Sequence, residues 1–221
     1  MSTLVRFLST SGSHIHVVFT ALTNITREHS CSEYTVLNDV ATALYGLVKP
    51  LEEVRYLVSS DRAESLVYTV LKAHGVSEHH AEVLEKLREQ GLVAVSTVFY
   101  PLLVVETARG PLERELISRS QLVSIGEYKL CAPRLEHLIV KLISMKLYPY
   151  SLYGYTLFFT WLSSGRINVE LLVDLLRTSG VSVEDVARSV EEMHDHIVLF
   201  KPHEFDKSQL EYFKNLLFSV K

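Results

Sequence analysis

The spacing of apolar and polar positions divides the 221-residue chain into a mixed N-terminal half and a helical C-terminal half. In the first half, short runs of β-branched and aromatic residues predict strands. Between them, apolar residues recur every three or four positions, as on one face of a helix. The predicted strands are 34–37, 53–58, 92–99, 102–107 and one or two within 121–131; the predicted helices are 15–30, 40–46, 61–73, 78–90 and a short one within 108–120. This succession is typical of an α/β or α+β domain.

From Pro133 onward the apolar spacing is helical throughout, and a proline suits the first turn of a helix. Helices are predicted just after Pro133 and then at 152–163, 167–178, 182–194 and 207–219. We therefore expect an α+β fold: an α/β domain with a mixed sheet and flanking helices at residues 1–131, and a helical domain at 132–221.

Composition excludes several classes of protein. A net charge of −4 gives no general attraction to nucleic acid or to anionic membranes. No apolar run reaches about 18 residues, so we expect no membrane span and no signal peptide. The cysteines, Cys31 and Cys131, are far apart and form no CxxC pattern, which predicts neither a zinc module nor a disulfide framework but a protein of the reducing cytoplasm. Only four asparagines and three glutamines occur, which favours a heat-adapted source.

The stretch KPLEEVRYLV, residues 49–58, places an acid and a guanidinium at the head of a predicted strand. Glu53 and Arg55 are two residues apart and therefore share one strand face. Taken alone, they are typical of a surface ion pair at a solvated strand edge. Glu52 points to the opposite face.

The order of YTVLNDVATALYG, KPLEEVRYLV and, further on, LLVVETARGPLEREL resembles the minimal nucleotidyltransferase superfamily. That family has a strand, a glycine-containing turn, a helix ending in Tyr-Gly, and then Arg-x-Thr-x-Asp-hydrophobic-Asp leading a strand. Tyr45 and Gly46 match the pair, Lys49 lies where the arginine is common, Glu53 lies at the first aspartate, and Glu106 lies at the third carboxylate. LEHLIVKLIS and GRINVELLVDLLRTSG resemble the family's C-terminal helices, and the similarity spans about residues 18–180.

The resemblance implies a fold and a chemistry whose key residues are altered in this chain. Nucleotidyl transfer needs carboxylates that hold Mg²⁺ and a small-residue turn whose amides approach the triphosphate. Asn38 and Asp39 stand at the glycine turn, and Asp39 brings negative charge to the phosphate position. Arg55 stands at the second metal aspartate and has no lone pair for a cation. Asn168 falls near the first aspartate of a C-terminal pair.

We therefore expect Glu53, Arg55 and Glu106 to form an ion cluster in place of a metal site, with no cofactor. The function implied is that of a degenerate nucleotidyltransferase-like pseudoenzyme with a binding or regulatory role. It would bind a protein partner, bind a small ligand in the old nucleotide cleft, or form one half of a toxin–antitoxin-like pair. If nucleotide binds, the corresponding positions are Asn38, Asp39, Lys49 and Lys141. One alternative is a divergent, active, Mg²⁺-dependent enzyme transferring NMP to a protein, RNA or small molecule. Another is an α/β scaffold with a helical dimerisation module.

Several residues also have plainer interpretations. Asp39 could cap the helix that follows it, and Lys141 could be a solvated lysine beside an apolar stripe. His194 and His196 could chelate a metal from a strand, although surface histidines are the favoured interpretation. Seven aromatics lie in residues 147–161, with no basic residue between Lys146 and Arg166. A homodimer contact or interdomain core is therefore favoured over a base-stacking platform, and nucleic acid is not an expected partner.

Overall fold

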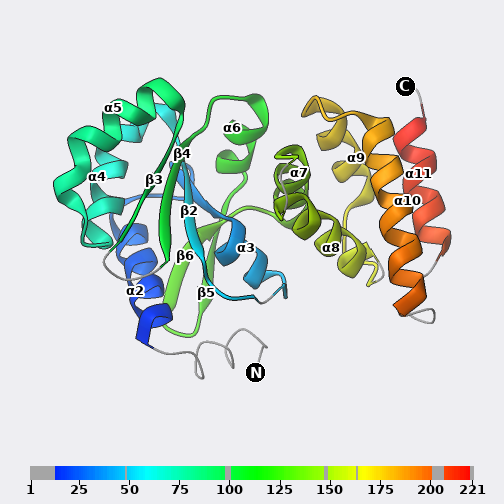
Figure 1. The fold of residues 1–221 in the computed structure, drawn as a ribbon, viewed down its shortest axis with the longest axis horizontal. Coiled ribbons are helices and arrows are strands. Elements are labelled where there is room, and N and C mark those ends of the chain that lie inside the picture. The colour runs from blue at the N-terminus through cyan, green and yellow to red at the C-terminus, as the bar shows by residue number, and fades with distance from the viewer. Residues whose placement is uncertain are drawn as a thin grey trace. The chain divides into compact units, whose positions relative to one another are not determined.

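The computed structural model describes residues 13–47, 49–97, 101–146, 149–162, 164–200 and 207–219. The chain forms two compact units, Met1–Arg134 and Leu135–Lys221 (Figure 1). The fold class is α+β, with a mixed sheet in the first unit and helices in the second. The last strand of the first unit ends at Ala132, beside the predicted boundary at 131/132.

The first unit is built on a four-stranded sheet of order β1-β2-β4-β3. Its strands are β1 (Tyr34–Leu37), β2 (Glu53–Val58), β3 (Leu92–Val95) and β4 (Leu102–Thr107). The central strands β2 and β4 are parallel, while β1 and β3 pair antiparallel to them. All six residues of β2 are buried, as expected for a strand covered on both faces.

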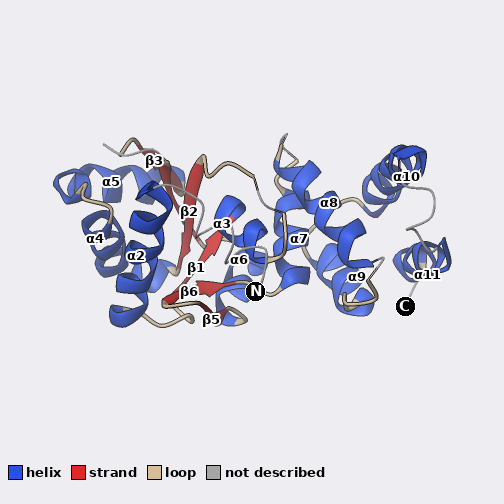
Figure 2. Cartoon of the chain, turned by 90° about the horizontal axis from the view of Figure 1, so that it is seen from below, coloured by secondary structure: helices blue, strands red, loops and turns tan. Residues whose placement is uncertain are grey.

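Helices cover the two faces of this sheet (Figure 2). One face carries α2 (Ser13–Glu28), α4 (Ala63–Ala73) and α5 (His80–Gln90), and the other carries α3 (Asn38–Leu44) and α6 (Pro111–Ser118). Because side chains alternate along β2, Arg55 faces α3 whereas Tyr56 faces α4. Tyr56 accordingly reaches His74, the residue that ends α4.

A hairpin of β5 (Gln121–Ile125) and β6 (Tyr128–Ala132) completes the first unit. Strand β6 lies beside α2 and β1, and its Cys131 forms a disulfide with Cys31, which lies in the turn between α2 and β1. The expectation of two unpaired cysteines is therefore wrong. A separation of 100 residues in sequence becomes a Cα–Cα distance of 5.1 Å because the hairpin folds back onto the start of the sheet.

The pairing removes the free thiols on which the cytoplasmic prediction partly rested, so that location stays a prediction. Among the residues that the structure describes, no helix is both long and apolar enough to cross a membrane.

The second unit contains α7 (Leu135–Ser144), α8 (Tyr150–Leu162), α9 (Val169–Thr178), α10 (Val183–Phe200) and α11 (Lys207–Phe218). Of the aromatic segment 147–161, whose first two residues lie outside the described part of the chain, Tyr155, Phe158 and Phe159 are buried. The Phe158 ring packs on Phe159 and on Phe213 of α11. Gly154 lets α8 approach α7, because a Cβ there would lie 2.9 Å from Ile143 Cγ1.

Local details both agree with and depart from the sequence predictions. Gly91 ends α5 in the left-handed conformation that glycine favours, and Ser182 caps α10 by accepting from the Asp185 N–H, as predicted. The strand proposed around His194 and His196 is wrong, because α10 continues to Phe200. Residues two apart on a helix diverge by about 200°, and these two side chains lie outside the described residues.

Candidate functional site

Strand register brings the three predicted charged positions together on the α3 face of the sheet. Glu53 and Arg55 alternate onto this face of β2. On the parallel neighbour β4, Arg55 is aligned with Val104 and Leu57 with Glu106, so the Glu106 side chain emerges on the same face. Glu53 and Glu106 are 53 positions apart in the sequence, because the chain needs a long crossover between two parallel strands.

Arg55 lies between the two glutamates and bonds to both. Its Nε donates to Glu53 Oε1 at 2.9 Å and its Nη2 to Glu53 Oε2 at 3.2 Å, which makes a bidentate pair. Its Nη1 donates to Glu106 Oε2 at 3.3 Å. Glu53 is 8% exposed and Arg55 is 6% exposed, so the solvated surface pair considered for this stretch is excluded. We call Glu53, Arg55 and Glu106 the ion cluster.

Asn38 extends the ion cluster from the start of α3. Its Nδ2 donates to Glu53 Oε1 at 2.5 Å. Its backbone has φ 50°, a left-handed conformation that asparagine tolerates better than other non-glycine residues. Asn38 therefore keeps the backbone conformation that a glycine would adopt in this turn. Its side chain fills the space that a glycine would leave open and points at Glu53.

Asp39 does not cap α3, contrary to the interpretation offered above. Its Oδ2 accepts from the N–H groups of Glu52 and Glu53, each at 2.9 Å, and its Oδ1 pairs with Lys49. The Asp39 carboxylate thus fastens the segment before β2 to the head of α3, because amides at a strand start otherwise need water or a side chain. Both charges at the expected phosphate position, Asp39 and Lys49, are engaged with each other.

The donor set of the ion cluster does not fit Mg²⁺. Divalent magnesium takes oxygen ligands in an octahedron, whereas both oxygens of Glu53 accept from a guanidinium that has no acceptor of its own. Across the described part of the chain, no group of three or more His, Cys, Asp or Glu side chains is placed to hold a metal ion.

The remaining predicted positions lie elsewhere in the two units. Tyr45, after α3, donates from its hydroxyl to Pro133 O at 2.6 Å. Lys141 is on α7 and only 6% exposed, so its interpretation as a solvated lysine is wrong. Asn168 caps α9 by accepting from Leu171 N–H at 3.0 Å. A capping amide explains this asparagine without a catalytic role.

A cavity of about 330 Å³ opens at the carboxyl ends of β2 and β4, a position that the sequence reasoning did not identify. Its lining includes Ser60, Asp61, Thr107 and Arg109 and none of the ion cluster. Arg109 Nη2 donates to the carbonyls of Leu87 and Arg88 at the end of α5. The sequence contains one indication of this cavity: polar residues come directly after β2 and β4, and the carboxyl ends of parallel strands are where ligand crevices form.

The site is thus a largely buried cluster on one face of a parallel strand pair, in which one guanidinium bridges two carboxylates. Comparison with known proteins assigns no family: no protein-family model and no curated protein matches the chain.

Proposed function

We propose that this chain is a nucleotidyltransferase-like protein whose metal and phosphate positions have been replaced by internal ion pairs, and that it acts by binding rather than by transfer. One observation carries the proposal: the Arg55 guanidinium bridges Glu53 and Glu106. The three positions that the resemblance equates with metal carboxylates converge on one sheet face. An unrelated scaffold gives no reason for that convergence.

The phosphate side of the site supports the same proposal. The turn before α3 retains a left-handed residue, Asn38, but the amide of Asn38 is bonded to Glu53. The Asp39 carboxylate occupies the N–H groups of residues 52 and 53. Negative charge and engaged amides at this position disfavour a triphosphate. A binding role for a protein partner or an uncharged small ligand fits this chemistry better than NMP transfer.

The test is to restore the missing carboxylate. Arg55→Asp would place three carboxylates on one face, and Arg55→Asn would keep a neutral oxygen ligand there if the acidic variant fails to fold. We expect one equivalent of Mn²⁺ to bind the folded variant in isothermal titration and to raise its melting temperature by mass action. Arg119→Asp, the same charge change at an exposed helix end, is the matched control and should gain no site.

Two results would overturn the proposal. Stoichiometric Mg²⁺ or Mn²⁺ binding by the unmodified protein, abolished by Glu53→Gln, would establish the divergent, active enzyme instead. Folded Arg55 variants that bind no metal would favour the α/β scaffold with a helical dimerisation module. A parallel thermal-shift screen of nucleoside triphosphates should show no Mg²⁺-dependent stabilisation of the unmodified chain.

A further inference from the structure

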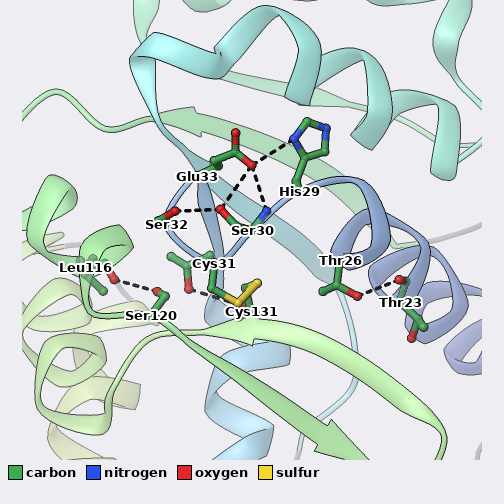
Figure 3. Close-up of a disulfide and its surroundings, with 11 residues drawn as sticks. Thr23, Thr26, His29, Ser30, Cys31, Ser32, Glu33, Leu116, Ser120 and Cys131 are labelled. Atoms are coloured by element: carbon green, nitrogen blue, oxygen red, sulfur yellow. Dashed lines mark hydrogen bonds and ion pairs between the residues drawn. A yellow bond between two sulfur atoms is a disulfide. The ribbon is translucent and has the colours of Figure 1, made fainter.

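The Cys31–Cys131 disulfide joins the turn between α2 and β1 to β6, the last strand of the first unit (Figure 3). Cys31 follows α2, immediately before the sheet begins, and Cys131 lies near the end of β6. Two residues later, at Pro133, the chain is about to leave the first unit for α7. The crosslink therefore acts on the place where the chain passes from one unit to the other. We call residues 131–133 the connector.

The two sulfur-bearing residues differ in access. Cys131 is fully buried at 0% exposure, whereas Cys31 is half-buried in a surface turn between the exposed residues Glu28 and Ser32. Thiol–disulfide exchange requires a thiolate to reach one sulfur along the S–S axis. A reagent from solvent therefore has Cys31 as its target, with Cys131 as the leaving thiolate.

The turn that carries Cys31 is held without help from the sulfur. Glu33 Oε2 accepts from Ser30 N–H at 2.9 Å, and the Ser30 and Ser32 hydroxyls are 2.7 Å apart (Figure 3). The Ser59 N–H donates to Glu33 O at 2.8 Å, which ties the turn to the end of β2. Breaking the disulfide leaves these bonds intact, so the Cys31 thiol stays in position.

Besides the disulfide, the connector is held by the pairing of Cys131 and Ala132 with Leu122 and Gln121 of β5, in a two-stranded sheet, and by two side chains. Thr35 Oγ1 donates to Cys131 O at 3.4 Å, and the Tyr45 hydroxyl donates to Pro133 O at 2.6 Å. Tyr45 follows α3, the helix whose first residue, Asn38, bonds to the ion cluster. The disulfide therefore holds the first residue of the connector, and the Tyr45 hydroxyl holds the last.

We propose that Cys31 is a modification site for thiol reductants, and that exchange at its sulfur loosens β6 and the connector reversibly. In the first step a thiolate R–S⁻ attacks Cys31 Sγ, the new R–S–Sγ bond forms, and the Sγ–Sγ bond breaks. The electron pair goes to Cys131 Sγ, which takes a proton from water. A second thiolate then attacks the sulfur of the R–S group, the R–S–S–R bond forms, and Cys31 Sγ leaves as a thiolate that takes a proton from water. Two reductant thiols are thereby oxidised to R–S–S–R, and the cysteine pair gains two electrons and two protons.

The first experiment locates the attacked sulfur. The oxidised protein is incubated with glutathione, quenched in acid, alkylated with iodoacetamide and mapped by peptide mass spectrometry. Glutathione on Cys31 together with alkylated Cys131 is the expected pattern. Glutathione on Cys131, or no adduct until the protein is unfolded by denaturant, would overturn the proposal.

The second experiment tests the consequence. Amide hydrogen exchange of β6 should quicken at least about tenfold on reduction, while the amides of α9 in the second unit serve as an internal reference. A Cys31→Ser/Cys131→Ala double variant should exchange at the fast rate with or without reductant. Removal of the reductant with mild oxidation should restore slow exchange in the unmodified protein. Unchanged exchange of β6 in the reduced protein would show a crosslink without the proposed effect.

Discussion

The two faces of strand β2 bury polar groups by opposite means. On the α3 face, Glu53 and Arg55 are buried as charges that neutralise each other. On the α4 face, Tyr56 is buried as a neutral hydroxyl 2.8 Å from His74 Nε2. Desolvation by burial raises the pKa of Tyr56 and lowers the pKa of His74 to about 4, so both are uncharged at neutral pH. The same strand thus buries polar groups in two ways: as oppositely charged partners on one face and as uncharged hydrogen-bonded partners on the other.

The charged face of β2 is the better candidate for a functional site. In a neutral hydrogen-bonded pair, each polar group needs only the other group to offset its burial. A buried ion cluster contributes little net stability, because the cost of desolvating the charges opposes their Coulomb attraction. A charged cluster kept at such cost on one face alone fits a site with a functional history, as the proposed function requires. Three predictions separate the energetics of the charged face from those of the neutral face.

The largest effect is expected from Arg55→Met, which keeps much of the side-chain length and removes the central cation. Glu53 and Glu106 would lose the guanidinium that bridges them, and removing one partner of a buried ion pair costs about 3–5 kcal/mol in the free energy of unfolding. Urea denaturation at neutral pH measures this loss. Arg119→Met should change stability by less than about 0.5 kcal/mol.

A triple variant provides the decisive control for that loss. Glu53→Gln/Arg55→Met/Glu106→Gln removes all three charges of the cluster together and should recover most of the stability, since replacing a buried ion cluster as a whole is far less costly than removing one member of it. If Arg55→Met costs under about 1 kcal/mol, the ion cluster is solvated in solution and the contrast between the two faces disappears.

The neutral face should respond to acid instead. Unfolded chains protonate His74 near its ordinary value of 6.5, whereas the folded chain resists protonation down to about 4. The stability that His74 contributes is therefore complete above pH 6.5 and is lost as pH falls from 6.5 to 4, by about 1.4 kcal/mol for each pH unit. The measurement is the difference in unfolding free energy between the unmodified chain and His74→Gln across this window. A difference independent of pH would mean that His74 is readily protonated in the folded protein.

Three strands of the four-stranded sheet were predicted well from the sequence, because local residue preferences and tertiary structure agree there. β1, β2 and β4 begin and end as expected, since apolar β-branched runs bounded by turn residues have no competing helical pattern. The 92–99 prediction was too long at residues 96–97, because β3 ends at Val95, and residues 98–99 lie outside the described part of the chain. The pattern VSTVF carries strand preference, but only the partner strand decides how much of it pairs.

Pairings between distant residues were harder to foresee. The strand face shared by Glu53 and Arg55 follows from a period of two, but their contact with Glu106 depends on the β2–β4 register. The Cys31–Cys131 bond depends on how the hairpin folds back, for which spacing gives no clue. Likewise, Asp39 has the composition of a helix cap, and only the path of residues 49–53 diverts its carboxylate to their amides.

The smallest effect should separate the two glutamates of the ion cluster. Arg55 donates two bonds to Glu53, which also accepts one from Asn38, whereas Arg55 donates a single bond to Glu106, at 3.3 Å, and the Glu106 side chain is 14% exposed. Glu53→Gln should therefore cost about 2 kcal/mol and Glu106→Gln about 0.5–1 kcal/mol in urea denaturation. Because Arg55 keeps its bidentate partner in Glu106→Gln, that variant leaves the cation anchored. Equal losses would show that the guanidinium is shared evenly, and the α3 face would then be a symmetric clamp of two carboxylates around one cation, as in a metal site.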